Sequence, residues 1–423
     1  MNNKPQDFLH SLIDYEKTVG YDYDLEAYQR FLEHFDAPQK ELSNVILIGG
    51  TKGKGSTAAI LSACLINGGY RVGLYSSPHL CRINERIRVN NKNISDAELE
   101  DYLTRIRPYV ITKKGARSFF EALTTVAFLH FLQKQVDFAI LEVGLGGRLD
   151  ATNATHPLIS VITRIGYDHT SLLGARLSQI TNEKAGIIRE NGKLITIHQR
   201  PDAEKILKKV AKERNSSIVF ADEQHDIKLT GRSLRGSNVS ITGRIGDIEA
   251  FLPLAGEHQI ENLSLALTVL FDLKTMGYYL DLDTIKQGIE NTQLHGRFEV
   301  LSEKPLIIFD CAHNQDSFQA LDKNIQALNI RDFCLVFGAN KDKDISYCLK
   351  NIIPKAKEVF LAKSENPRAV EPGDLLARAK RYNSKITICN SVNEAVTAAN
   401  KNSEGRPIII TGSFYLWQKE WKM

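Results

Sequence analysis

The stretch Val45-Ile46-Leu47-Ile48-Gly49-Gly50-Thr51-Lys52-Gly53-Lys54-Gly55-Ser56-Thr57 decides the fold of this chain. A short β-branched run is followed by glycines, a lysine and a hydroxyl, and then by an apolar helical stretch over residues 58–66. This order predicts a strand, a loop and a helix that bind phosphate. Backbone N–H groups, the positive end of the helix and the charge of Lys54 would all meet the phosphate oxygens.

The stretch departs from the standard phosphate-loop pattern G-x-x-x-x-G-K-[ST]. Ile48 stands at the position of the first glycine, and Gly55 separates Lys54 from the hydroxyl of Ser56. A glycine-rich turn that binds nothing therefore stays open as an alternative at this point.

The composition is that of an ordinary globular protein. With 423 residues, the chain is long enough for about two or three domains. Hydrophobic residues make up 43% and charged residues 25%, and the net charge of +4 is too small to indicate a nucleic-acid partner. No apolar stretch approaches a membrane span, and the N-terminus lacks the apolar core of a signal peptide. The six cysteines are scattered without a C-x-x-C pair, so we expect reduced thiols and a cytoplasmic location.

Strand-like runs alternate with helical stretches along most of the chain, and this alternation predicts a mostly parallel sheet covered on both faces. The expected strands of the first series are Val45–Ile48, Val72–Tyr75, Phe138–Val143, Ser160–Ile165, Leu194–Ile197 and Ile218–Phe220. Those of the second series are Leu306–Asp310, Phe333–Phe337, Glu358–Leu361, Ile386–Cys389 and Ile408–Thr411.

Between the two series, the segment Asp226–Leu254 alternates with period two around several glycines, which predicts antiparallel hairpins on an edge of the domain. A boundary is expected near Asn291–Gly296. The predicted fold is α/β. A P-loop-type, mostly parallel sheet domain over residues 1–295 is followed by a smaller Rossmann-like α/β domain over residues 296–423.

Glu142 ends an otherwise apolar strand pattern, where a carboxylate is rare unless it has a partner. At the carboxyl end of a parallel strand beside a phosphate loop, it is well placed to hold the Mg²⁺ that accompanies ATP. The alternative is a structural ion pair with Arg148.

Two further residues gain their interest mainly from position. His169 follows a strand in the turn Tyr167-Asp168-His169 and could be a metal ligand, although a histidine there is more often structural. From spacing alone, Lys184 is a solvated lysine on a helix that ends at Gly186.

The second series opens with a strand that ends in Asp310 and continues into Cys311-Ala312-His313-Asn314. Asp310 could bond a ribose or an adenine edge. The alternative is an ordinary Asp beside a helix N-cap formed by Asn314.

Taken together, these motifs resemble those of the folylpolyglutamate synthase/dihydrofolate synthase family, within the Mur ligase superfamily. The segment 50–56 is similar to the family pattern G-T-N-G-K-G-S, with Lys52 in place of asparagine, and this pattern accounts for Gly55. The segment Glu142–Asn153 is an unbroken match to a second motif. Other similar segments follow in family order: Ser76–Leu80, Asp168–Thr170, Glu183–Gly186, His258–Gln259 with Asn262, Gly296–Glu299 and Asp310 with Ala312–Asn314. The resemblance covers essentially residues 10–415.

The resemblance implies an ATP-dependent amide ligase. A folate or dihydropteroate carboxylate would attack the γ-phosphate of MgATP, and the amine of L-glutamate would then attack the resulting acyl phosphate. The implied partners are these small molecules, with no nucleic acid and no membrane, and we expect a monomer.

The resemblance also implies roles for individual residues. The implied catalytic residues are Lys54, His169 and Lys184, of which Lys184 matches a carbamylated lysine of the family. The implied ligands of two Mg²⁺ ions are Ser77 and Glu142 for the first and His169 for the second. The implied ATP contacts are Gly53, Lys54, Gly55, Ser56, Asn262, Arg297, Asp310 and His313. The implied substrate contacts are Phe119, Phe120, Glu121, Ala151, Thr152 and Asn153.

Other functions remain as alternatives. The nearest are a folylpolyglutamate synthase without dihydrofolate synthase activity and a Mur-type ligase acting on a different carboxylate. A GTPase-like switch is disfavoured because Asn340-Lys341-Asp342-Lys343 has a lysine where the guanine motif N-K-x-D requires aspartate. A dehydrogenase is disfavoured because no G-x-G-x-x-G follows Asp310.

Overall fold

The computed structural model describes residues 8–9, 11–12, 24–110 and 117–418. Its chain divides into two compact units, which we describe separately. The first consists of residues 1–228, 240–250 and 259–293, and the second of residues 229–239, 251–258 and 294–423.

An eight-stranded sheet forms the centre of the first unit, in the order β4-β3-β2-β5-β1-β6-β7-β8. The strands from β2 to β8 in this order are parallel, whereas β3 and β4 are antiparallel. The strands are β1 (Val45–Gly49), β2 (Val72–Tyr75), β3 (Ile87–Val89), β4 (Lys92–Asn93), β5 (Phe138–Glu142), β6 (Ile159–Ile162), β7 (Lys193–Thr196) and β8 (Ser217–Phe220).

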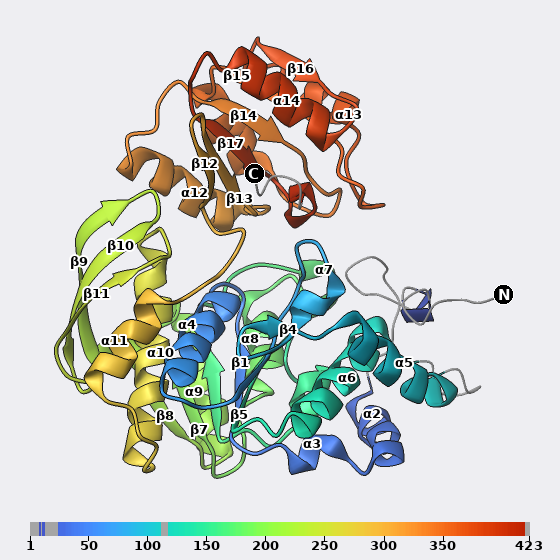
Figure 1. The fold of residues 1–423 in the computed structure, drawn as a ribbon, viewed down its shortest axis with the longest axis vertical. Helices are drawn as coiled ribbons and strands as arrows, with labels where there is room; N and C mark the ends of the chain where they lie inside the picture. Colours follow the sequence, from blue (N-terminus) through green and yellow to red (C-terminus); the bar gives the residue numbers. More distant parts are fainter. Residues whose placement is uncertain (1–7, 10, 13–23, 111–116, 419–423) are drawn as a thin grey trace. The chain divides into compact units, whose positions relative to one another are not determined.

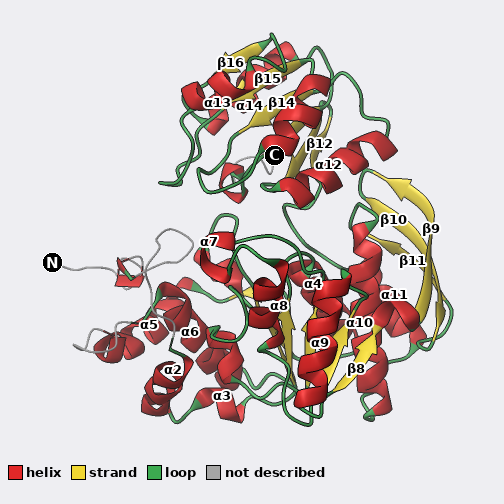
Figure 2. Ribbon diagram, turned by 180° about the vertical axis from the view of Figure 1, so that it is seen from behind, coloured by secondary structure: helices red, strands yellow, loops and turns green. Residues whose placement is uncertain are grey.

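Helices cover both faces of this sheet, with α4 turned to the viewer in Figure 1 and α9 in Figure 2. The helices of this unit are α2 (Leu25–Leu32), α3 (Pro38–Glu41), α4 (Lys54–Asn67), α5 (Asp96–Val110), α6 (Phe119–Gln133), α7 (Thr170–Leu173), α8 (Leu177–Ala185), α9 (Pro201–Glu213), α10 (His258–Thr275) and α11 (Leu282–Glu290).

Strand β1 lies in the middle of the sheet because it is apolar on both sides. Every residue of Val45–Gly49 is buried, and β5 and β6 pair with it in parallel on either side. A strand covered on both faces requires such a continuous apolar run. The carboxyl ends of β1 and its neighbours therefore meet at one edge of the sheet.

The second unit contains a six-stranded sheet in the order β12-β13-β17-β14-β15-β16, parallel except for β12. Its strands are β12 (Glu299–Glu303), β13 (Leu306–Asp310), β14 (Cys334–Phe337), β15 (Glu358–Leu361), β16 (Ile386–Ile388) and β17 (Ile408–Thr411). Its helices are α12 (Gln315–Ala327), α13 (Pro372–Ala379) and α14 (Val392–Asn402).

The predicted α/β class with mostly parallel sheets is confirmed, and the main differences concern the edges. The hairpin segment forms a separate three-stranded sheet of β9 (His225–Ser233), β10 (Gly236–Gly243) and β11 (Ile248–Leu252), in the order β11-β10-β9. The antiparallel strands β3, β4 and β12 were not predicted. They are short and partly polar, because they lie at or next to an edge of their sheet and do not carry the apolar run of a central strand.

Among the described residues, no helix is both long enough and apolar enough to span a membrane.

His225 begins β9 and is buried, and neither of its ring nitrogens has a hydrogen-bond partner within the described part of the chain. Burial, and then the charge of Arg244, lowers the pKa of His225 from 6.5 to about 4. Between these two pH values, the unfolded chain binds the proton and the folded chain does not, so folding is opposed as the pH falls.

We predict that the wild-type protein loses up to about 1.4 kcal/mol of unfolding free energy per pH unit through His225 between pH 6.5 and pH 4. The variant His225→Leu should lack this contribution, whereas His156→Leu, at an exposed histidine, should retain it. Urea unfolding at several pH values measures the difference. Parallel pH curves for wild type and His225→Leu would contradict the prediction.

Candidate active site

The phosphate-loop segment connects β1 to α4 with a backbone that only glycine adopts easily. Gly50 has a φ of 133° and Gly53, which caps α4, has a φ of 93°. A Cβ on Gly50 would lie 1.9 Å from the Thr163 hydroxyl oxygen, and a Cβ on Gly53 would lie 2.0 Å from Asn262 Oδ1. Thr163, directly after β6, and Asn262 on helix α10 therefore pack closely against the loop.

Two lysines donate to the same backbone carbonyl of this loop. Lys54 Nζ lies 3.3 Å from Gly50 O, and Lys184 Nζ on α8 lies 2.8 Å from it. Lys184 is buried, contrary to the solvated lysine that spacing alone indicates. Burial, and then the charge of Lys54, lowers the pKa of Lys184 to about 7. At neutral pH, Lys184 is therefore an amine that is protonated only part of the time.

Glu142 lies at the end of β5 beside the loop and is buried. Its Oε2 accepts a hydrogen bond from the Ser77 backbone N–H at 3.3 Å, and its Oε1 lies 4.0 Å from Lys54 Nζ. The alternative pairing of Glu142 with Arg148 is wrong, because Arg148 pairs with Glu183 on α8 at 2.9 Å. The carboxylate thus stays directed at the loop.

Asp168 and His169 form a turn on the neighbouring side of the loop. Asp168 Oδ2 pairs with Lys52 Nζ at 3.1 Å, and Asp168 Oδ1 accepts the backbone N–H of His169 at 3.0 Å. His169 has a φ of 49° and precedes α7. In the described part of the chain, no three His, Cys, Asp or Glu side chains gather in a group that could hold a metal ion. A metal here would need ligands from outside the protein as well.

The donors at the loop fit a magnesium ion held jointly with a nucleotide. In such sites, Mg²⁺ takes one or two protein oxygens and completes its shell with phosphate oxygens and water. The Glu142 carboxylate and the Ser77 hydroxyl are of this type, whereas the imidazole of His169 is a less usual ligand for so hard an ion.

The substrate candidates at the start of α6 are buried. Glu121 Oε2 accepts the Ser118 backbone N–H at 2.7 Å in a capping box, and Glu121 Oε1 pairs with Arg117 at 3.3 Å. Phe119 is in cation–π contact with Arg86, and the ring of Phe120 lies 5.5 Å from that of Tyr75. These contacts fix the first turn of α6.

The candidates Ala151, Thr152 and Asn153 lie in a short 3-10 helix and are also buried. Asp150 Oδ1 accepts the Thr152 N–H at 3.0 Å. Asn153 Nδ2 donates to Arg148 O at 3.0 Å and to Gly186 O at 3.4 Å. The amide of Asn153 therefore joins this segment to the end of α8, the helix that carries Lys184.

In the second unit, Arg297, Asp310 and His313 lie together at the carboxyl end of β13. Asp310 accepts backbone N–H groups of Phe298 at 2.9 Å and Ala312 at 2.8 Å. Burial raises the pKa of Asp310 to about 6, although Arg297 acts in the opposite direction. His313 Nδ1 lies 2.8 Å from Cys311 O, and Asn314 caps α12 as the alternative interpretation expected.

Sequence reasoning did not single out several residues that shape these sites. Lys52 was noted only as a departure from the family pattern, yet it pairs with Asp168. Phe414 lies beneath the Arg297 guanidinium at 5.1 Å and 5.4 Å from the ring of His313. A phenylalanine after a strand carries no signal of this role, since the contact is made between segments far apart in the chain.

Comparisons with known proteins give matches along most of the chain. Residues 48–270 match the Mur ligase middle domain, and residues 296–414 match the Mur ligase glutamate ligase domain. The chain is 30% identical to the folylpolyglutamate synthase of Lacticaseibacillus casei, over 96% of this chain and 97% of that protein.

A protein of Haloferax volcanii named a probable bifunctional folylpolyglutamate synthase/dihydropteroate synthase is 28% identical over 96% of this chain. The chain spans about half the length of that relative, because the match covers 50% of it. Among solved structures, Escherichia coli FolC in complex with DHPP and ADP superposes with a TM-score of 0.86 at 29% identity, covering 98% of this chain and 96% of that one.

We predict that Gly53→Ala abolishes measurable ADP binding, because the new Cβ would lie 2.0 Å from Asn262 Oδ1 in a strained backbone. Gly69→Ala is the matched control, since Gly69 at the other end of α4 has a φ of 85° but nothing within 4 Å of an added Cβ. Both variants should have a lower free energy of unfolding than the wild type, but only Gly53→Ala should fail to bind ADP in calorimetric titration. Equal ADP affinities for the two variants would contradict the prediction.

Proposed function

The chain belongs to the folylpolyglutamate synthase/dihydrofolate synthase family of Mur ligases, and we propose that it joins L-glutamate to the carboxylate of a folate or dihydropteroate at the expense of ATP. The observation that carries the proposal is the loop itself. Lys54 and Lys184 share the Gly50 carbonyl, and the buried carboxylate of Glu142 lies beside them. These groups support a site for phosphoryl transfer to a carboxylate.

The chemistry proceeds in two steps. A carboxylate oxygen of the substrate attacks the γ-phosphorus, and the bond to the β,γ-bridging oxygen breaks, which releases ADP and forms an acyl phosphate. The amine of L-glutamate then attacks the acyl carbon, loses a proton, and expels inorganic phosphate. Both transition states carry negative charge that fixed cations and N–H groups must stabilise. We assign this work to Lys54 and to the N–H groups of Gly53, Gly55 and Ser56.

Ser77, Glu142 and His169 would hold Mg²⁺, which neutralises phosphate charge when bound. The carboxylate of Glu142 also has a second role, which does not depend on the metal ion. Glu142 also restrains the segment at Ser77 through its backbone N–H, so the loop and this segment are held together before any ligand arrives.

We further assign Lys184 as the site of a carbamate. A lysine whose pKa is lowered to about 7 is partly neutral at physiological pH, and a neutral amine is the form that adds to carbon dioxide. The carbamate is anionic, so it would reverse the repulsion between Lys184 and Lys54.

The remaining assignments follow the family pattern. Asn262, Arg297, Asp310 and His313 bind the nucleotide in this proposal. Phe119, Phe120, Glu121, Ala151, Thr152 and Asn153 form or support the binding site of the folate or dihydropteroate. The division at residues 295 and 296, a monomeric state and a cytoplasmic location stay predictions.

The test is incorporation of labelled L-glutamate in the presence of MgATP, with dihydropteroate and tetrahydrofolate offered in separate reactions. We expect product with at least one of the two, accompanied by equal amounts of ADP and phosphate. ATP-dependent incorporation with neither acceptor, but with another carboxylate, would instead favour a Mur-type ligase for that substrate.

In the same assay, Lys54→Ala should lower kcat by about 10²–10³-fold, as expected for the loss of one electrostatic stabiliser of the transition state. Far-UV circular dichroism and the melting temperature establish whether the variant is folded. A folded Lys54→Ala enzyme with near wild-type turnover would overturn the assignment of the loop.

A separate prediction concerns the carbamate. Lys184→Ala should lose activity, and acetate or formate should restore part of it by supplying an anion at the vacated position. Lys184→Arg should be as inactive as Lys184→Ala, because a guanidinium is charged at all relevant pH values and does not form the carbamate.

Carbon-13 NMR of protein equilibrated with labelled bicarbonate gives a direct readout. A carbamate resonance should appear in the wild type and be absent from Lys184→Ala. Full activity of Lys184→Arg, or an unchanged spectrum for the two proteins, would show that the lysine acts without the modification.

A further inference from the structure

Arg164 follows β6 and contacts the phosphate loop through its backbone. Its carbonyl oxygen accepts hydrogen bonds from Thr51 N at 2.9 Å and from Lys52 N at 3.1 Å. Two consecutive N–H groups of the loop are thereby fixed by one residue of the neighbouring strand connection. The conformation of the loop depends on where this carbonyl lies.

The side chain of Arg164 extends to helix α10. Its Nε donates to Glu261 Oε2 at 3.1 Å, and its Nη2 donates to Glu261 Oε1, which makes a bidentate pair. A fork of this kind fixes direction as well as distance, which a lysine in the same place could not do. Arg164 thus joins the loop and the first turns of α10.

The residue after Glu261 is the one that touches the loop. Asn262 Oδ1 is the atom that a Cβ on Gly53 would meet at 2.0 Å, and Asn262 Nδ2 is held by Gln259 Oε1 at 2.8 Å. The pair at Glu261 and the contact at Asn262 therefore restrain α10 against the loop at two adjacent positions.

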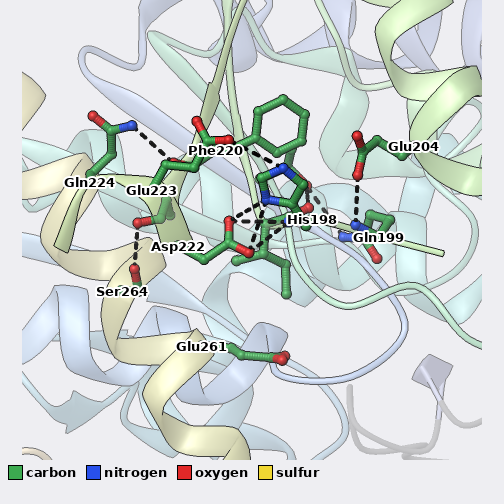
Figure 3. A network of polar contacts seen from close by, with 12 residues as sticks. His198, Gln199, Glu204, Phe220, Asp222, Glu223, Gln224, Glu261 and Ser264 are labelled. Atoms are coloured by element: carbon green, nitrogen blue, oxygen red, sulfur yellow. Dashed lines mark hydrogen bonds and ion pairs between the residues drawn. The ribbon is translucent and has the colours of Figure 1, made fainter. Parts of the chain in front are cut away.

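A second set of contacts holds Arg164 from the opposite side. Its Nη1 donates to the His198 carbonyl at 2.6 Å. The ring of His198 lies 3.2 Å from Asp222 through Nδ1 and 3.2 Å from Glu223 through Nε2, and it stacks on Phe220. Figure 3 shows His198 beside Asp222, with Glu261 projecting from α10 below them.

These contacts follow the order of the strands in the sheet. The loop follows β1, Arg164 follows β6, His198 follows β7 and Asp222 follows β8, and the sheet places these four strands side by side. This series of polar contacts therefore runs along the edge of the sheet where the strands have their carboxyl ends, and it ends at the loop.

We propose that Arg164 is a positioning residue of the ATP site, which holds residues 51–52 of the loop and Asn262 in the arrangement that receives the nucleotide phosphates. The inference rests on the proposed function, because it takes ATP as the ligand of this loop. Loss of the side chain should weaken ATP binding more than it weakens the fold.

The experiment is calorimetric titration of MgATP, without a carboxylate acceptor, into the wild type and into Arg164→Met, Glu261→Gln and the double variant. Each single variant should raise the Kd for ATP about tenfold, as expected for the loss of a hydrogen-bonded charge pair. The Kd of the double variant for ATP should be no higher than that of the single variant that binds ATP more weakly, because both changes break the same pair.

Lys193→Met is the matched control. Lys193 Nζ pairs with Asp272 Oδ2 at 2.9 Å and ties the amino end of β7 to the far part of the same helix α10. The variant Lys193→Met should change the melting temperature about as much as Arg164→Met does, and it should leave the Kd for ATP within about twofold of wild type.

The outcomes separate the two claims. Three results would each overturn the inference and leave the proposed function standing. They are a wild-type Kd for ATP in folded Arg164→Met, additive losses of ATP affinity in the double variant, and a loss of ATP affinity in Lys193→Met equal to that in Arg164→Met. If Arg164→Met fails to fold, Glu261→Gln, which keeps the size of the side chain, decides by the same criterion. A wild-type protein that binds no ATP would contradict the proposed function and this inference together.

Discussion

The carbonyl oxygen of Gly50 accepts hydrogen bonds from the side chains of two lysines, Lys54 and Lys184, and the arrangement of the candidate site depends on this contact. Two like charges on one acceptor are tolerated because one of them, Lys184, is buried with a pKa lowered to about 7. The geometry also requires glycine, since a Cβ at this position would meet Thr163. A strained loop, a charged lysine and a partly neutral lysine are thereby held together before a ligand binds.

The sheet brings the other reactive groups to this point. Glu142 reaches it from β5, Asp168 from the connection after β6, and Lys184 from α8. The sequence allowed the strands and their polar ends to be predicted, because apolar runs that end in a charged residue are distinctive. The mutual arrangement of those ends follows from the parallel pairing alone.

The partners of individual side chains could not be predicted from the sequence. Glu142 and Arg148 are six positions apart and complementary in charge, yet Arg148 pairs with Glu183 because the turn directs it to α8. Lys184 reads as a solvated residue from its spacing, and only the packing of α8 against the loop buries it. The contacts of Lys52 and Phe414 likewise depend on tertiary structure. The antiparallel strands β3, β4 and β12, at or next to an edge of their sheets, were missed for a related reason, since their patterns are too short and too polar to be distinctive.

The central claim is that the γ-phosphate of ATP passes to a substrate carboxylate at this loop. Acceptor labelled with ¹⁸O in that carboxylate tests it most directly, in a reaction with MgATP and L-glutamate in unlabelled water. Because the acyl phosphate loses its phosphate through the oxygen that attacked, the account predicts one ¹⁸O atom in each inorganic phosphate that is released. Unlabelled phosphate, with the one displaced ¹⁸O atom found in water or on AMP and the other kept in the amide carbonyl, would contradict it.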